Sequence, residues 1–226
     1  MQSEEKLSVL IVDDEPSLNE LFVFGLNKYG FCAEGVLGGR ECLEKLQTGY
    51  HPDLILLDLI MDHMDGWETL RHIKTNEETA DILVLMQTGK NVTYHEAKTF
   101  SPWIVDYIMK PVTPKVTIEH IKRAIQIHTC LLKARDTAVT SGFADAEVME
   151  CLQTYQNLIV TKELSRLLER KREMGDGNSI NGAEQYAEFV SSLKGKYETL
   201  HVKDYLNLAL CEPITRNEPV QQNDIV

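Results

Sequence analysis

Four strongly apolar runs in the first half of the chain each end at an ionisable or hydroxyl residue. The runs are residues 9–12 before Asp13 and Asp14, 54–57 before Asp58, 82–87 before Thr88, and 107–109 before Lys110. Runs of this kind are typical of central strands that are covered on both faces. Because parallel strands end on the same side of a sheet, we expect the polar residues at their ends to share one crevice.

Strand-like and helix-like segments alternate from residue 7 to about residue 140, which is the pattern of repeated βα units around a parallel sheet. Five such units fit this stretch. Gly30 and Gly49 stand where the first two helices are expected to end. The sequence therefore predicts an α/β fold with a doubly wound, five-stranded parallel sheet.

The last helix of this region begins near Pro114 and continues past the point where a compact domain would end it. A heptad-like seam recurs in it at alternating steps of three and four residues, at Ile118, Ile121, Ile125, His128 and Leu132. The first half of such a seam is expected to pack on the sheet, and the second half on another helix or another chain.

Residues 143–226 have helical patterning, with apolar stripes near 148–159 and 164–168, a third helix from about 183 and a fourth over 202–210. The proposed boundaries are residues 1–130 for the α/β domain, 131–142 for a helical linker, 143–211 for an all-α output or dimerisation domain, and 212–226 for a disordered tail.

The charge balance is acidic, with 23 Lys and Arg against 35 Asp and Glu and a formal net charge of −12. This balance argues against a protein that coats nucleic acid or an anionic membrane without specificity. No apolar run is long enough to cross a bilayer, and the acidic start of the chain is unlike a secretory signal. We therefore expect a cytoplasmic protein with no membrane partner.

The acidic residues of the crevice predict a metal site. Asp13, Asp14 and Asp58 would repel one another without a cation, and carboxylate oxygens favour Mg²⁺. A phosphoryl group needs such a cation, and Lys110 and the hydroxyl of Thr88 would add positive charge and a hydrogen bond. Asp58 closes the central strand and is followed by a loop containing glycine, so it is the best candidate for an aspartyl nucleophile.

Each of these residues also has a simpler interpretation. Asp13 and Asp14 could cap a helix, and Thr88 could be a turn hydroxyl. Those interpretations are preferable for any residue alone, but the combination with Asp58 and Lys110 favours a common site.

These residues also resemble the receiver domains of two-component response regulators over roughly the first 130 residues. The matching segments are Asp13-Asp14-Glu15, residues 57–61, Met64-Asp65-Gly66, Thr88-Gly89 and residues 106–111. The resemblance implies a flavodoxin-like sheet with strand order 2-1-3-4-5, an order that is known for receivers.

The resemblance also implies the roles of the site residues. Asp58 would accept a phosphoryl group from a histidine kinase. Asp13 and Asp14 would hold Mg²⁺ together with Asp58 and the backbone carbonyl of Ile60. Lys110 would pair with the phosphoryl oxygens.

Two further residues are implied to respond to the phosphoryl group. Thr88 would move to bond it, and Tyr107 would swing inward as a switch residue, although a half-buried strand aromatic is an equal alternative. Lys110-Pro111 is expected to be a cis peptide bond. The chain departs from the family at Asp62, where proline is usual, and in the short segment 90–103.

Two hypotheses describe the output of the helical half. In the first, it is a dimerisation or docking module, which would make the protein a homodimer or bind it to a downstream protein. In the second, it contains a divergent DNA-binding helix-turn-helix, with Arg166 and residues 170–172 as basic contacts. Acidic residues outnumber basic ones from residue 141 onward, which favours the first. No second catalytic cluster is evident, so the protein is predicted not to be an enzyme beyond promoting its own phosphorylation and dephosphorylation.

Overall fold

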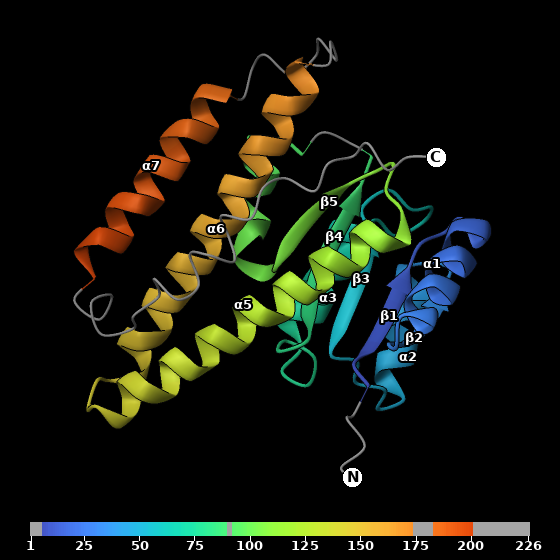
Figure 1. Ribbon diagram of the computed structural model, residues 1–226, viewed down its shortest axis with the longest axis horizontal. Helices are drawn as coiled ribbons and strands as arrows, with labels where there is room; N and C mark the ends of the chain where they lie inside the picture. The colour runs from blue at the N-terminus through green and yellow to red at the C-terminus, as the bar shows by residue number, and fades with distance from the viewer. Residues whose placement is uncertain (1–5, 90–91, 174–182, 201–226) are drawn as a thin grey trace. The chain divides into compact units, whose positions relative to one another are not determined.

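The computed structural model describes residues 6–89, 92–173 and 183–200 and contains a five-stranded parallel sheet (Figure 1). The strands are β1 (Ser8–Val12), β2 (Cys32–Val36), β3 (Leu54–Asp58), β4 (Leu83–Thr88) and β5 (Asp106–Met109). They lie in the order β2-β1-β3-β4-β5, and every neighbouring pair is parallel. The predicted fold class and strand order are confirmed.

The burial of the strands follows their place in the sheet. All five residues of β3 are buried, as expected for a strand with neighbours on both sides and helices on both faces. Strand β2 pairs only with β1, and three of its five residues are exposed. The central strands therefore hold the core, and their carboxyl ends carry the polar residues.

The described residues also form seven α-helices. They are α1 (Pro16–Lys28), α2 (Gly39–Gln47), α3 (Gly66–Thr75), α4 (Tyr94–Phe100), α5 (Pro114–Thr140), α6 (Asp145–Glu173) and α7 (Ala183–Thr199). Helix α1 packs closely against the first turn of α5, because a Cβ atom on Gly25 would lie 2.5 Å from Cβ of Pro114. Helices α2 and α3 contact each other.

The chain divides into two compact units. The sheet unit comprises residues 1–90 and 106–120, and the helical unit comprises residues 91–105 and 121–226. Helix α4 thus belongs to the helical unit, and α5 contributes residues to both. The domain boundaries near 130 and 142 stay predictions. The expected helix over 202–210 and the expected disorder of 212–226 lie outside the described residues.

Helices α5 and α6 form a helical hairpin that turns at Ser141-Gly142. Gly142 has a φ of 97°, the left-handed conformation that glycine adopts most readily at the end of a helix. The N–H of Phe143 donates to Ala138 O at 3.2 Å and the N–H of Gly142 to Val139 O at 3.0 Å. This pair of bonds is the Schellman arrangement, and it satisfies carbonyls that the helix end would otherwise leave open. Helix α7 lies beside α6 (Figure 1).

The buried face of α5 differs from the seam predicted for its second half. Ile127, Leu131, Ala134 and Ala138 are buried against α6, whereas Leu132 is 45% exposed. The alternation of four and three residues is present, but it starts at a different residue. The prediction was wrong because it counted only large side chains, while two of these four buried residues are alanines. Packing on another helix, one of the two expected partners, is what the structure shows.

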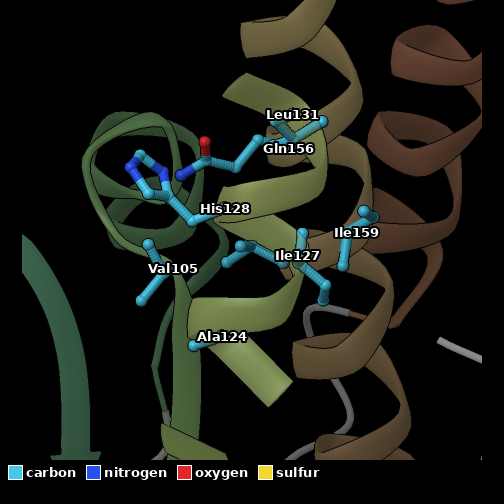
Figure 2. A pocket seen from close by; sticks show the side chains of 8 residues that line it. Val105, Ala124, Ile127, His128, Leu131, Gln156 and Ile159 are labelled. Carbon is cyan, nitrogen blue, oxygen red and sulfur yellow. The ribbon is translucent and has the colours of Figure 1, made fainter. Parts of the chain in front are cut away.

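A small, mostly apolar hollow lies in the helical unit between α5, α6 and Val105 (Figure 2). Side chains from both helices line it, and Figure 2 shows Gln156 of α6 beside His128 of α5. The amide Nε2 of Gln156 donates to the backbone carbonyl of Ile104 at 3.1 Å. This bond ties α6 to the chain that follows α4.

Two adjacent leucines separate the predicted and observed faces of α5. We expect Leu131→Ala to lower the free energy of unfolding by about 2 to 4 kcal/mol, because it leaves a cavity against α6. Leu132→Ala makes the same chemical change on the exposed face and should cost less than about 1 kcal/mol. Urea unfolding followed by circular dichroism measures both, and equal losses would show that the assignment of the buried face is incorrect.

Candidate functional site

The polar residues at the strand ends come together at one edge of the sheet. Asp58 is the last residue of β3 and Thr88 the last of β4, while Asp13 and Asp14 follow β1 and Lys110 follows β5. One carboxylate oxygen from each of the three aspartates lies within 4.8 Å of the others. In the described part of the chain, no other group of three or more acidic, histidine or cysteine side chains is placed to hold a metal ion.

Lys110 bridges two of the carboxylates. Its Nζ donates to Asp13 Oδ2 and to Asp58 Oδ2, both at 2.7 Å. Burial disfavours the charged amine, but the hydrogen bonds to both carboxylates and their negative charges outweigh it and raise the pKa of Lys110. The lysine therefore stays protonated and offsets the repulsion between Asp13 and Asp58.

Asp58 is almost fully buried, with 5% of its surface exposed. This burial raises its pKa above the ordinary value of 3.8; the hydrogen bond and charge of Lys110 oppose the rise, and the charge of Asp13 adds to it. The backbone N–H of Ile60 also donates to Asp58 Oδ1, at 3.4 Å. A buried carboxylate that is costly to ionise is poised to gain a cation or an electrophile.

The loop after β3 donates a hydrogen bond to Asp14. The backbone N–H of Asp62 donates to Asp14 Oδ2 at 2.8 Å, and the side chain of Asp62 is exposed. Proline, which is usual at this position in receivers, has no N–H and could not make this bond. The backbone N–H at Asp62 therefore fastens the loop to Asp14.

Gly66 is required because its loop passes close to the backbone of Asp58. Its N–H donates to Leu59 O at 3.0 Å, and an added Cβ would lie 2.4 Å from the backbone oxygen of Asp58. The glycine therefore leaves room for the backbone at the end of β3. A pattern of residue types does not reveal a close contact with the main chain.

Thr88 and Tyr107 are both buried within the sheet unit. The backbone N–H of Lys110 donates to Thr88 O at 2.8 Å, which joins the ends of β4 and β5. The ring of Tyr107 meets that of Trp67 edge to face, with centroids 6.4 Å apart. Lys110-Pro111 is a cis peptide bond, as expected.

Two polar contacts in the sheet unit escaped the sequence analysis. Asp106 and His120 pair across β5 and α5, with Oδ2 and Nδ1 2.7 Å apart. Asn19 of α1 is buried and donates to backbone carbonyls at the ends of β1 and β2. Of these three residues, only Asp106 could have been noticed from the sequence, because it is a charged residue at the start of an apolar strand.

The fold and the acidic crevice define a receiver-type α/β protein, and comparison with known sequences agrees. Residues 9–122 match the family described as the response regulator receiver domain. The chain belongs to this family. The match ends within α5 and leaves the rest of the helical unit outside it.

Individual relatives extend the comparison. A probable cyclic di-GMP phosphodiesterase of Vibrio cholerae is 29% identical over 195 residues, which are 84% of this chain and 42% of that protein. The phosphate regulon transcriptional regulatory protein PhoB of Pseudomonas aeruginosa is 31% identical over 127 residues, 53% of this chain and 52% of that protein. A solved receiver domain from Methanoculleus marisnigri is 45% identical, covers 51% of this chain and 93% of that structure, and has a TM-score of 0.44. The chain spans about half the length of the curated relatives it matches.

The first relative corrects one prediction. The chain was predicted not to be an enzyme, because no second catalytic cluster is evident in its sequence. That prediction is wrong as stated, because an alignment that reaches beyond the receiver relates this chain to a protein named as a phosphodiesterase. The search for catalytic clusters was confined to this chain. It gave no information about relatives, and the aligned residues make up only 42% of this one.

Membrane insertion has no support in the described helices, since none is both long and apolar enough to cross a bilayer.

The raised pKa of Asp58 predicts a pH-dependent stability. Between pH 3.8 and the raised value, the folded chain binds a proton that the unfolded chain has lost, so the free energy of unfolding falls as pH rises. Asp58→Asn removes this titration. We expect the stability of the variant relative to the wild type, measured by urea unfolding without Mg²⁺, to increase with pH through that window and then level off. A difference that is independent of pH would contradict the assignment.

Proposed function

We propose that this chain is a phosphoacceptor response regulator and that Asp58 receives the phosphoryl group from a phosphohistidine of a histidine kinase. The observation that carries the proposal is the bridge of Lys110 to Asp13 and Asp58 at 2.7 Å within the acidic cluster. The charge of Lys110 lowers the cost of ionising the buried carboxylate at the end of β3. The kinase partner favours a cytoplasmic location.

The donor set of the cluster fits Mg²⁺, which prefers a few carboxylates and retains bound water. Asp13, Asp14 and Asp58 would hold the ion with the backbone carbonyl of Ile60. When bound, the ion supplies positive charge to the phosphoryl oxygens. Ile60 lies two residues beyond Asp58, in the loop that Asp62 fastens to Asp14.

In the proposed reaction, an oxygen of Asp58 attacks phosphorus and forms a new O–P bond as the N–P bond of phosphohistidine breaks. The electron pair leaves with the imidazole nitrogen, which then takes up a proton. The Nζ of Lys110 exchanges its contact with Asp58 for a phosphoryl oxygen. The hydroxyl of Thr88 donates to a second oxygen, and Tyr107 responds to that movement.

The site assignment predicts which residue is modified. We expect acetyl phosphate with Mg²⁺ to add one phosphoryl group to the wild type, and Asp58→Asn to abolish the addition because no carboxylate remains to attack. Intact-mass spectrometry measures both. Asp53→Asn removes an aspartate at the opposite end of β3, which bonds Ser8, and is expected to behave as the wild type. Undiminished uptake by Asp58→Asn would refute the assignment.

We further propose that the helical unit carries the signal through the segment between β4 and β5. Two of its side chains hold this segment at both ends. Tyr186 Oη of α7 donates to Val92 O at 2.9 Å, and Gln156 of α6 donates to Ile104 O at 3.1 Å. Burial raises the pKa of Tyr186, so its hydroxyl stays protonated and able to donate.

Aromatic contacts reinforce the first of these attachments. The ring of Tyr94 in α4 meets Tyr186 and Phe189 of α7 nearly at right angles, with centroids 5.9 and 5.8 Å apart. Val92 lies four residues after Thr88, and Ile104 lies three before Tyr107. A change at either residue would therefore reach α6 and α7 through a short stretch of chain.

This coupling predicts a response of α7 to activation. We expect beryllofluoride, a phosphoryl mimic, to change amide hydrogen exchange in α7 of the wild type, and Tyr186→Phe to remove most of that change because the bond to Val92 is lost. Tyr197→Phe alters a tyrosine of the same helix that stacks on Tyr155 of α6, and should respond as the wild type. A response that is the same in all three proteins would refute the coupling.

The output itself is proposed to be a contact with a downstream protein or with a second copy of the chain. Long helices that pack side by side support this more than a DNA-binding helix pair, which is short and steeply crossed. Helix α7 also mixes acidic and basic residues rather than presenting a basic face. The side chains of residues 170–172 lie outside the described part of the chain.

The alignment with the Vibrio cholerae protein favours a second candidate, in which the helical unit passes the signal to hydrolysis of cyclic di-GMP. The alignment extends past the receiver match, so the relative resembles the helical unit as well. An assay of cyclic di-GMP hydrolysis with and without beryllofluoride distinguishes this output from partner binding alone.

A further inference from the structure

Asn19 binds the backbone that carries the acidic pair Asp13 and Asp14. The residue is 4% exposed, in the first turn of α1. Its amide Nδ2 lies 2.8 Å from Val36 O, 3.2 Å from Asp13 O and 3.4 Å from Ile11 O. An amide has two protons, so the two shorter contacts are the principal hydrogen bonds.

These contacts extend the pairing of β1 and β2 past the end of both strands. The backbone N–H of Asp13 donates to Val36 O at 3.3 Å, and Asn19 donates to the same oxygen. Asn19 then binds the carbonyl of Asp13, which lies beyond the last residue of β1. Because that carbonyl belongs to the peptide unit between Asp13 and Asp14, its hydrogen bond fixes how the two acids are oriented relative to each other.

The chain leaves space for this amide. A Cβ on Gly35 would lie 1.8 Å from Oδ1 of Asn19 and 2.9 Å from its Cγ. The absence of a side chain at Gly35 is therefore what allows Asn19 to reach both carbonyls. Two residues that do not belong to the acidic cluster thus act together on its geometry.

We infer that Asn19 is a positioning residue for the metal site, which sets the peptide between Asp13 and Asp14 so that both carboxylates face one cation. The inference depends on the proposed role of these aspartates in holding Mg²⁺. It gives α1 a role in metal binding, although Asn19 is not one of the proposed ligands.

A second asparagine of α1 provides a matched control. Asn27 bonds Ala33 of β2 through both ends of its amide, at 3.0 and 2.9 Å. It ties the same helix to the same strand, but far along both from the acidic pair. Asn27→Leu therefore measures how far losing hydrogen bonds between α1 and β2 affects Mg²⁺ binding when they lie away from the acidic pair.

The test measures binding of Mg²⁺ alone to the full chain by isothermal titration calorimetry. We expect Asn19→Leu to weaken binding by about tenfold or more, as for other residues that orient metal ligands, and Asn27→Leu to change it by less than about twofold. Phosphorylation of Asp58 by acetyl phosphate should need more Mg²⁺ in Asn19→Leu but approach the wild-type rate at saturation. A merely structural defect would lower the rate at every Mg²⁺ concentration.

Gly35→Ala tests the same inference if Asn19→Leu folds poorly. It displaces the amide of Asn19 and leaves its chemistry intact, so it should also weaken Mg²⁺ binding. Wild-type affinity in both variants, or an equal loss in Asn27→Leu, overturns the inference. A wild-type chain that binds no Mg²⁺ overturns the proposed metal site instead, and with it the ground for this inference.

Discussion

The bridge from Lys110 to Asp13 and Asp58 is the interaction on which the sheet unit depends. Two buried carboxylates in one crevice repel each other, and burial raises the pKa of Asp58. A lysine that follows the last strand brings its charge to residues at the ends of the first and third strands. In the observed strand order β1 and β3 are adjacent, and both acids lie within reach of that amine.

Backbone contacts set the finer geometry around this bridge. The N–H of Asp62 holds a carboxylate oxygen of Asp14, Asn19 holds the carbonyl of Asp13, and Gly66 lets its loop lie against Asp58. The site is therefore built as much by what the main chain donates and accepts as by its charged side chains. In the helical unit, too, Gln156 and Tyr186 bind backbone carbonyls rather than side chains.

The strand ends and the fold class could be predicted from the sequence because burial and the alternation of strands and helices are expressed in residue type. The residues of the crevice followed from the same pattern. The contact surface of α5 could not, since Ala134 and Ala138 suit a buried or an exposed helix face equally well. Asn19 was missed because its partners are carbonyls, which every residue has, and nothing along the chain marks which of them lack a strand neighbour.

The hydrogen bond from residue 62 to Asp14 has a consequence for how this position can vary. The donor is the main chain, and the side chain of Asp62 points to solvent. Nineteen of the twenty ordinary amino acids offer the same N–H, and proline is the exception. Related chains could therefore carry any residue except proline at this position and keep the hydrogen bond to Asp14. A proline would remove this bond, and the loop would then have to be held in another way.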